Sequence, residues 1–90
     1  MKLIFYSKPG CHLCEGLQEK LDQVQNPKFE LELRDITTRE DWFQAYQYEI
    51  PVLFLEDSSN QVLLPRLSPR ATVQQLATLL QKYCSQVDNQ

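Results

Sequence analysis

The sequence predicts one α/β domain whose elements follow the order βαβαββα. Two short runs, residues 2–6 and 50–55, are almost wholly apolar, as expected for strands buried on both faces of a sheet. Residues 12–25 instead repeat apolar side chains at helical intervals. Because the chain has 90 residues, of which 42% are hydrophobic, it can build one small core. We therefore assign residues 1–87 to a single domain and residues 88–90 to a frayed polar tail.

The first half of the domain opens with a strand and a helix. Residues 2–6 form the strand, and Pro9 and Gly10 end it. The helix of residues 12–25 follows. Its apolar stripe consists of Leu13, Leu17, Leu21 and Val24.

An edge strand and a second helix come next. Residues 29–34 alternate strictly between apolar and charged side chains, which predicts a half-buried edge strand with its charges facing solvent. Thr37 and Glu40 have the spacing of a capping box, so Thr37 is the expected N-cap of a short helix. That helix is expected to pack on the sheet through its aromatic side chains, Trp42, Phe43 and Tyr46.

The second half predicts a hairpin and a last helix. Residues 50–55 and 61–64 form the two strands, and the turn-forming run 57–60 joins them. Ser68 followed by Pro69 predicts the start of the helix, because serine is a good N-cap and proline suits the first helical position. The apolar stripe of this helix is Val73, Leu76, Ala77, Leu80, Tyr83, Cys84 and Val87.

Two cysteines carry the chemistry of this sequence. Cys11 and Cys14 stand three positions apart where the first strand gives way to a helix, and thiols at this spacing can close into a small disulfide. Cys11 is the predicted nucleophile, because the free N–H groups and the positive dipole end of a helix N-terminus favour a thiolate. Cys14, one turn inside the helix, is the predicted resolving thiol. Lys8 is expected to tune the pKa of the Cys11 thiol through its positive charge. His12 is a second candidate for this role, and an exposed residue of the first helical turn is the alternative interpretation.

Metal binding is the main alternative for this cysteine pair. A structural zinc ion needs four ligands, and only Cys84 and His12 remain to complete a site. Cys84 belongs to an apolar stripe, which is typical of a buried and inert cysteine. We therefore favour redox chemistry and assign no residue to a metal, while a metal site and chemically idle cysteines stay open as alternatives.

Ile50 and Pro51 form the second candidate feature. A proline that enters a buried strand cannot donate to the strand ladder, so either a cis bond in a tight turn or an ordinary trans proline explains its presence. A tight turn would leave the backbone of Ile50 free to pair with an extended substrate that carries a thiol.

Composition excludes several classes of function. The net charge of −3 and the absence of a basic stripe argue against a nucleic-acid partner. The apolar run at residues 3–6 is far shorter than the core of a signal peptide, and no later run approaches the roughly 20 apolar residues of a membrane span. Three cysteines do not make a disulfide framework. We expect a cytoplasmic monomer without a membrane partner.

The chain resembles the thioredoxin superfamily and, within it, the small glutaredoxins. The resemblance rests on Cys-His-Leu-Cys at residues 11–14 after a strand, Ile-Pro-Val at residues 50–52 before another, and the element order. More narrowly, residues 8–15 (KPGCHLCE) are similar to the opening of a glutaredoxin-like family of small proteins whose role is poorly defined. The resemblance implies a thioredoxin-like fold, in which a four-stranded mixed sheet is flanked by three helices. These helices are distributed over both faces of the sheet.

The resemblance also implies roles for single residues. Cys11 becomes the attacking thiolate, and the Ile50–Pro51 bond becomes cis. In glutaredoxins the backbone beside this proline pairs with glutathione, which assigns Ile50 and Pro51 to substrate binding. Lys8 matches the glutaredoxin lysine three residues before the first cysteine and is assigned to the same role.

The region after the last strand departs from the glutaredoxin pattern. Glutaredoxins usually carry a Gly-Gly pair and an acidic or polar residue there, which cradle the γ-glutamyl end of glutathione. Residues 64–70 (LPRLSPR) contain neither glycine nor acid, so we expect no tightly bound cofactor and only a weak role for glutathione. Arg66 is a candidate for attracting a substrate carboxylate, although a solvated surface charge is the alternative.

These observations predict a glutaredoxin-like thiol/disulfide oxidoreductase. The Cys11/Cys14 dithiol would exchange with a protein disulfide or with glutathione disulfide, and a thiol reductase system or glutathione would restore it. Two alternatives use the same fold without turnover. One is a redox sensor, and the other is a binding or adaptor module that is possibly metal-binding.

Overall fold

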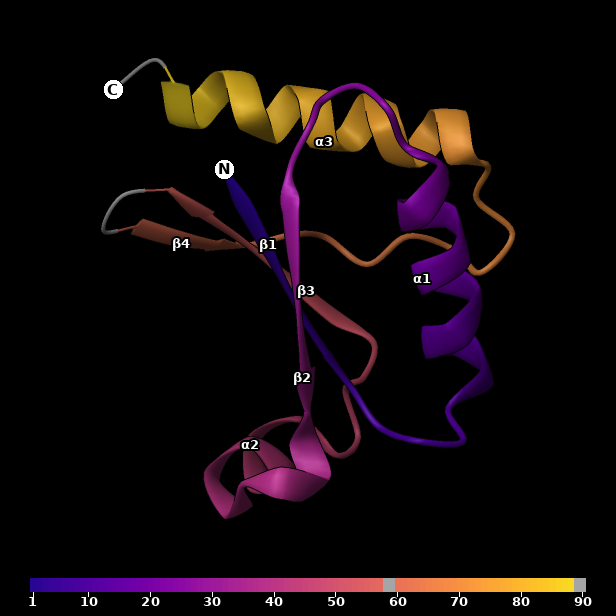
Figure 1. Cartoon of the computed structure of the whole chain (residues 1–90), viewed down its shortest axis with the longest axis vertical. Coiled ribbons are helices and arrows are strands. Elements are labelled where there is room, and N and C mark those ends of the chain that lie inside the picture. Colours follow the sequence, from indigo (N-terminus) through magenta and orange to yellow (C-terminus); the bar gives the residue numbers. More distant parts are fainter. Residues whose placement is uncertain (58–59, 89–90) are drawn as a thin grey trace.

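The element order and the sheet follow the prediction. The structure is a computed structural model that describes residues 1–57 and 60–88, and the side chains of residues 1–57 and 60–84. The elements are β1 (Lys2–Ser7), α1 (His12–Gln23), β2 (Glu30–Asp35), the 3-10 helix η1 (Ile36–Thr38), α2 (Glu40–Tyr46), β3 (Val52–Asp57), β4 (Asn60–Leu63) and α3 (Val73–Asp88). Figure 1 shows how α1, α2 and α3 are arranged around the sheet. The predicted βαβαββα order is therefore confirmed.

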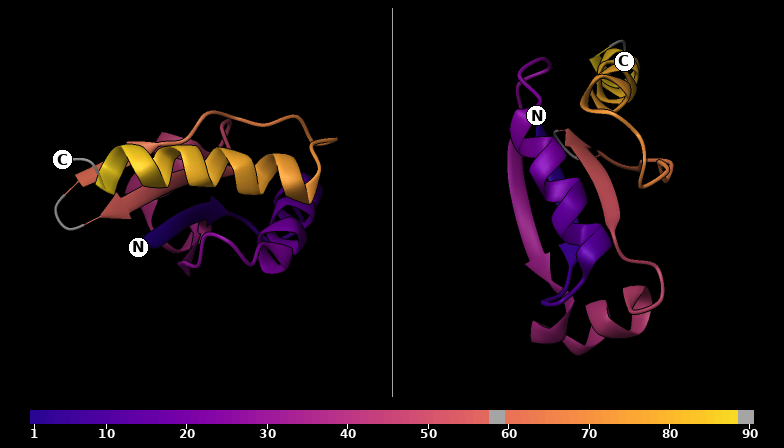
Figure 2. Two further views of the ribbon diagram at one scale, coloured as in Figure 1. Left: turned by 90° about the horizontal axis from the view of Figure 1, so that it is seen from above. Right: turned by 90° about the vertical axis from the view of Figure 1, so that its right-hand side faces the viewer.

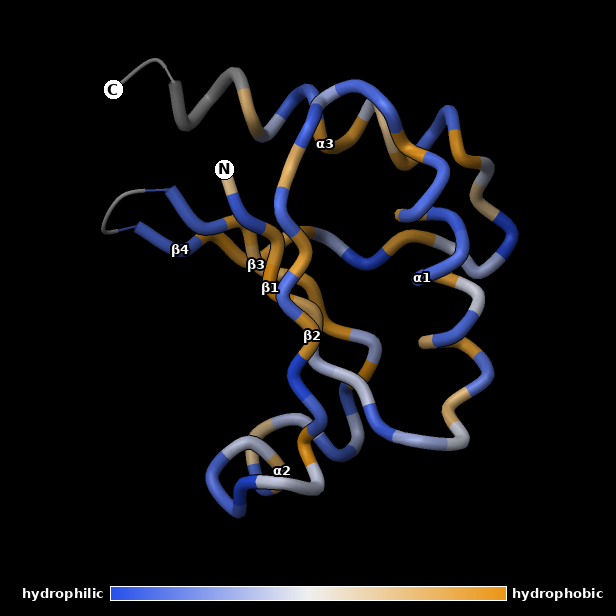
Figure 3. The backbone as a smooth tube through the Cα atoms, viewed as in Figure 1, coloured by the Kyte–Doolittle hydropathy of each residue, from blue (hydrophilic) through white to orange (hydrophobic). Residues whose placement is uncertain are grey.

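The sheet is mixed and has four strands in the order β2-β1-β3-β4. β1 runs parallel to β2 and antiparallel to β3, and β3 pairs antiparallel with β4 as the predicted hairpin. β2 lies at the edge, as its alternating sequence predicted. The central β1 holds three side chains with no exposed surface, Leu3, Ile4 and Phe5. Figure 3 shows the most hydrophobic segments gathered in β1 and β3.

The two faces of the sheet carry separate hydrophobic clusters because side chains alternate along each strand. Leu3 and Phe5 face α1 and α3, and together with these helices they form the larger cluster. Ile4 and Tyr6 face the opposite side, where the aromatic residues of α2 pack as predicted. Figure 2 shows α3 and α1 from two further directions, with α2 apart from both. The helices thus cover both faces of the sheet.

One expectation about β2 is wrong, because Arg34 does not face solvent. Its guanidinium carbon lies 5.5 Å from the centre of the Tyr6 ring and 5.3 Å from that of Trp42. Its Nη1 donates to the Tyr6 hydroxyl at 2.8 Å, and its Nε pairs with Glu32. Hydrogen bonds from Arg34 and then from Lys2 lower the pKa of Glu32. The aromatic rings of Tyr6 and Trp42 attract the Arg34 cation. The alternating sequence of β2 does not reveal this contact, because both rings belong to other elements.

The start of α2 also differs from the prediction. Thr37 is not an N-cap, since it lies inside η1, and α2 begins at Glu40. The Asp35 carboxylate caps η1 instead, accepting from the Thr37 N–H at 2.9 Å and the Thr37 hydroxyl at 2.6 Å. Aspartate is at least as good an N-cap as threonine. The helical segment therefore begins directly after Asp35, and not after Thr37.

The start of α3 lies four residues later than the predicted N-cap implies. Thr72 is the cap: its hydroxyl accepts from the Gln75 N–H at 3.1 Å, and the Gln75 side chain accepts from the Thr72 N–H at 2.8 Å. This reciprocal pair is a capping box. Ser68 forms a turn, in which its carbonyl accepts from the Ala71 N–H at 2.9 Å. Residues 64–72 therefore form an irregular connection that crosses the molecule before α3 begins.

The C-terminal helix continues into the expected tail. α3 reaches Asp88, so the first of the three residues predicted to fray is helical. Residues 89–90 lie outside the described residues, and so do residues 58–59 of the predicted hairpin turn.

Cys84 is only partly buried, with its Sγ 3.1 Å from the Met1 Sδ. Across the described residues, no helix has the length and apolarity needed to cross a membrane.

Candidate redox site

Cys11 and Cys14 form a disulfide at the start of α1. Their Cα atoms lie 5.2 Å apart, within the range that a disulfide requires. The pair connects the residue that caps α1 to the third residue of that helix. The site therefore lies just beyond the carboxyl end of the central strand β1.

A tight turn delivers Cys11 to its capping position. The Cys11 N–H donates to the Lys8 carbonyl at 3.3 Å, and Gly10 has a φ of +80°. Proline at the second position and a glycine with positive φ at the third are the signature of a type II turn. The backbone of Cys11 is then extended, and its Sγ accepts from the Cys14 N–H at 3.2 Å. A free N–H group of the helix start thus points at the Cys11 sulfur.

The two sulfurs differ in exposure. Cys11 is partly exposed, whereas Cys14 retains 3% of its accessible surface and belongs to the larger hydrophobic cluster. An incoming disulfide can therefore reach Cys11 but not Cys14. The division of roles between Cys11 and Cys14 stays a prediction, and this asymmetry is a geometric argument for it.

Lys8 and His12 flank Cys11 at the protein surface. Lys8 is exposed and supplies the backbone carbonyl of the turn. The His12 side chain is 95% exposed, and its Nδ1 lies 3.7 Å from the Glu15 carboxylate. That carboxylate offsets any positive charge on His12. The predicted effect of both residues on the Cys11 thiol stays a prediction.

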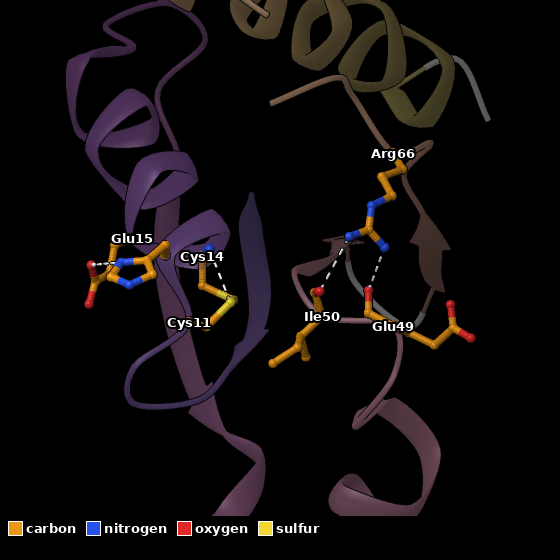
Figure 4. The surroundings of a disulfide bond; sticks show 7 residues. Cys11, Cys14, Glu15, Glu49, Ile50 and Arg66 are labelled. Atoms are coloured by element: carbon orange, nitrogen blue, oxygen red, sulfur yellow. Dashed lines mark hydrogen bonds and ion pairs between the residues drawn. A yellow bond between two sulfur atoms is a disulfide. The ribbon is translucent and has the colours of Figure 1, made fainter. Parts of the chain in front are cut away.

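The loop before β3 faces the disulfide. The Ile50–Pro51 bond is cis, as the resemblance implied. The Ile50 side chain packs against the cluster that contains Cys14, and Cys11 packs against the same cluster. In Figure 4 this side chain extends from its loop towards the side on which the disulfide lies. The structure therefore brings the two predicted halves of the site together.

The backbone of Ile50 is not free, which corrects one expectation. Its N–H donates to the Tyr46 carbonyl at 3.1 Å, in the turn that ends α2. Its carbonyl accepts from Arg66 Nη2 at 3.3 Å, and Arg66 Nη1 donates to the Glu49 carbonyl at 2.9 Å. Figure 4 shows this guanidinium directed at both carbonyls. Arg66 thus ties the connection after β4 to the proline loop, a role that sequence reasoning missed.

Removal of the Arg66 side chain is expected to loosen the proline loop. We expect Arg66→Ala to lower the free energy of unfolding by about 1 kcal/mol, because two carbonyls lose a charged donor at an exposed position. Arg66→Lys restores only part of this loss, since an ammonium group lacks the planar fork that spans two acceptors. Urea unfolding measures both values.

Arg70, an exposed arginine of the same connection, provides the matched control. Its replacement by alanine is expected to cost less than about 0.5 kcal/mol. Equal losses for the two alanine variants would contradict the role of Arg66 as a tie.

A groove opens beside the disulfide. Its volume is about 560 Å³, and it lies between α1, the proline loop and the connection after β4. Its lining includes Leu13, which is 48% exposed. The sequence predicted Leu13 as part of the core stripe, but Cys14 takes the buried position in this turn of α1. We found no signal in the sequence for this groove, because it forms between segments distant in the chain.

Metal binding is the alternative function for the cysteine pair. Among the residues that the structure describes, there is no group of three or more histidine, cysteine, aspartate or glutamate side chains placed to hold an ion. Cys84 lies beside Met1, and His12 faces Glu15. The structure thus does not bring these two residues together as the additional ligands that a zinc site would need.

The fold and the cysteine pair define a protein of the thioredoxin-fold class with a Cys-X-X-Cys disulfide at the start of its first helix. The model of the glutaredoxin-like domain family (DUF836) matches residues 2–81. The chain therefore belongs to this glutaredoxin-like family.

Solved structures support the same fold. Thioredoxin 1 from Thermosipho africanus superposes with a TM-score of 0.65 at 15% identity, covering 100% of both chains. A structural-genomics target protein from X. campestris gives 0.62 at 24% identity, covering 89% of this chain and 96% of the other. A malarial protein gives 0.63 at 18% identity, covering 90% and 93%. Such identities establish the fold alone. A search of curated proteins found no match.

Proposed function

We propose that the protein is a thiol/disulfide oxidoreductase in which Cys11 attacks and Cys14 resolves. One observation carries this proposal: the partly exposed Cys11 caps α1 with its sulfur, which accepts a helix N–H, while Cys14 is buried one turn further along. The free N–H groups and the dipole of a helix start stabilise a thiolate at the capping position. Thiolate character and access are the two requirements for attack on a disulfide.

The reaction balances as two successive exchanges. The Cys11 thiolate attacks one sulfur of the substrate disulfide, which forms a mixed disulfide and releases the other substrate sulfur as a thiolate. Cys14 then loses its proton, attacks the Cys11 sulfur and releases the second substrate sulfur. Two electrons pass from the Cys11/Cys14 pair to the substrate. One substrate thiolate takes up the proton that Cys14 loses, and the other takes up a proton from solvent, which replaces the one that the Cys11 thiol released when it ionised.

Each catalytic cycle leaves Cys11 and Cys14 as a disulfide, so a reductant must restore the dithiol before the next cycle. A dithiol protein of the thiol reductase class, or two molecules of glutathione, would reduce the Cys11/Cys14 disulfide and become oxidised. The only glycines of the chain are Gly10 and Gly16, so the connection after β4 lacks the close backbone approach that glutathione uses in glutaredoxins. We therefore propose a protein disulfide as the substrate. A reducing compartment such as the cytoplasm, where the dithiol can be restored, suits this activity.

Equilibration in a series of glutathione redox buffers tests the proposal. Alkylation of the quenched samples, followed by intact-mass and peptide analysis, is expected to show one two-electron transition confined to Cys11 and Cys14. Cys84 should be alkylated throughout. Absence of a transition, or a transition that involves Cys84, would contradict the assignment.

A redox sensor is the second candidate, and one observation favours it. Both backbone groups of Ile50 already have partners, so a substrate cannot pair there without displacing them. A sensor would give the same two-electron transition but negligible rates with any disulfide substrate. The alternative of a metal-binding adaptor is tested by metal analysis of the purified protein, because such a module would carry a stoichiometric metal ion.

A further inference from the structure

We propose that Arg66 is a positioning residue for the exchange reaction. It holds the proline loop, residues 47–51, beside the disulfide and so confines exchange to the Cys11 sulfur. Arg66 acts through Ile50, whose side chain packs against the hydrophobic cluster that contains Cys14. This inference rests on the proposed function, because it names the residue that keeps the second sulfur of that site out of reach.

The Arg66 side chain projects from a firmly anchored part of the chain. Two residues earlier, Leu64 is buried, and its N–H donates to the Leu53 carbonyl of β3 at 3.0 Å. Pro65, between Leu64 and Arg66, has a backbone φ that its ring fixes. Less conformational entropy is therefore lost when the guanidinium forms its hydrogen bonds.

Hydrogen bonds hold the proline loop through both its N–H groups and its carbonyls. The N–H groups of Glu49 and Ile50 donate to the Tyr46 carbonyl at 2.8 and 3.1 Å. The carbonyls of the same two residues accept from Arg66 at 2.9 and 3.3 Å. Pro51 follows, and it has no N–H group with which to join the sheet. Loss of the Arg66 side chain would therefore release the carbonyl side of this loop.

Ile50 connects the proline loop to both hydrophobic clusters of the domain. It is partly buried and packs against the larger cluster, which contains Cys14, and against the smaller cluster, which the aromatic residues of α2 cover. Figure 4 shows its side chain extending towards the side of the disulfide, while Arg66 binds the carbonyl of the same residue. Movement of the loop would withdraw Ile50 from the larger cluster and open a path to Cys14.

Shielding of Cys14 decides where a mixed disulfide forms. A thiolate that attacks a disulfide forms a new S–S bond to one sulfur and releases the other as a thiolate. When only Cys11 is accessible, each mixed disulfide forms at Cys11, and Cys14 stays available to resolve it. A mixed disulfide on Cys14 would instead place the substrate sulfur inside the hydrophobic cluster.

Two variants with one motif thiol each measure this selectivity. Cys14→Ser retains Cys11, Cys11→Ser retains Cys14, and each full-length protein is treated with glutathione disulfide. The remaining thiolate attacks one sulfur of this probe, forms a mixed disulfide and releases one glutathione thiolate. Peptide mass analysis gives the rate at each position and separates it from any adduct on Cys84. The rate at Cys11 divided by the rate at Cys14 is the selectivity.

Arg66→Ala, introduced into both single-thiol proteins, is expected to lower the selectivity at least about fivefold. A buried thiol reacts through local opening, and loss of the Arg66 hydrogen bonds favours the open loop, so the Cys14 rate rises. The Cys11 rate should change less than about twofold, because Cys11 is already partly exposed. Arg66→Lys should give a value between wild type and Arg66→Ala, since an ammonium group lacks the fork that spans two carbonyls.

Ile50→Ala tests whether Arg66 acts through this side chain. It should raise the Cys14 rate as Arg66→Ala does. Addition of Arg66→Ala to Ile50→Ala should change the rate less than about twofold further, because both substitutions remove the same shield. Independent effects that multiply in the double variant would overturn the inference.

Lys20→Ala is the matched control for general loss of stability. Lys20 Nζ donates to the Pro69 carbonyl at 2.7 Å, so this variant also removes a charged tie to the connection after β4 but leaves the proline loop tied to Arg66. Its selectivity should stay within about twofold of the wild type. Urea unfolding of each variant shows how far stability itself has changed. Equal losses of selectivity in Lys20→Ala and Arg66→Ala, or no loss in Arg66→Ala, would overturn the inference.

Failure of the proposed function gives a different result. Cys11 would then form no adduct with glutathione disulfide, whichever residue stands at position 66. Iodoacetamide replaces the disulfide probe in that case, and its reaction with Cys14 is compared between variants. Faster alkylation in Arg66→Ala than in Lys20→Ala would uphold the shielding by Arg66, and equal rates would overturn it.

Discussion

Replacement of Cys11 by serine is expected to reduce disulfide exchange to the uncatalysed rate. A serine hydroxyl stays protonated at neutral pH, so the cap of α1 no longer presents an anion to the substrate. Cys14 cannot substitute for it, because its sulfur is buried in the larger hydrophobic cluster. Initial rates with a peptide disulfide, measured beside those of the wild type, give the result directly.

Cys84→Ser is the matched control for the Cys11 variant. Cys84 lies on α3 beside Met1, at the end of the sheet away from the disulfide, so its loss should leave the exchange rate within about twofold of the wild type. Circular dichroism confirms that both variants fold. Exchange that survives in Cys11→Ser, or disappears in Cys84→Ser, would show that the wrong thiol has been assigned.

Replacement of Cys14 by serine has the second large effect, which is of a different kind. Cys11 can still attack a disulfide, but no thiol then resolves the intermediate, so turnover stops after one exchange. The variant should accumulate a mixed disulfide close to one equivalent. Intact-mass analysis detects it as an added half-substrate that dithiothreitol removes.

The double variant, with serine at both positions 11 and 14, is the control for this trapping experiment. It should accumulate no adduct, which shows that Cys84 does not take part. An adduct located on Cys84, or no adduct with any disulfide, would contradict the division of roles between Cys11 and Cys14.

The parts of the fold that local pattern determines were predictable. β1, the alternating edge strand β2 and the hairpin all form as predicted, although β3 runs from Val52 to Asp57 rather than over residues 50–55, and β4 runs from Asn60 to Leu63 rather than over residues 61–64. The cysteine pair was also evident, because spacing along one helix start is a local property. The cis bond before Pro51 followed only from family resemblance, since a proline alone allows both isomers.

The parts that depend on contacts between distant segments were not predictable. The start of α3 is a different case, because Thr72 and Gln75 have the spacing of a capping box, a local signal that was overlooked in favour of the Ser68–Pro69 pair. Arg66 was recognised as a cation near the site, but its bonds to carbonyls 16 and 17 positions earlier leave no trace in the sequence. The groove between α1, the proline loop and the connection after β4 depends on both features, because an α3 that began at Pro69 would have replaced part of the connection that lines it.

The neighbouring sulfurs of Met1 and Cys84 have a practical consequence for engineering. They lie 3.1 Å apart, so the first residue of the chain touches the last helix, and the central strand separates this end of the molecule from Cys11. A fluorescent label attached beside Met1 and Cys84 would therefore leave access to Cys11 unobstructed.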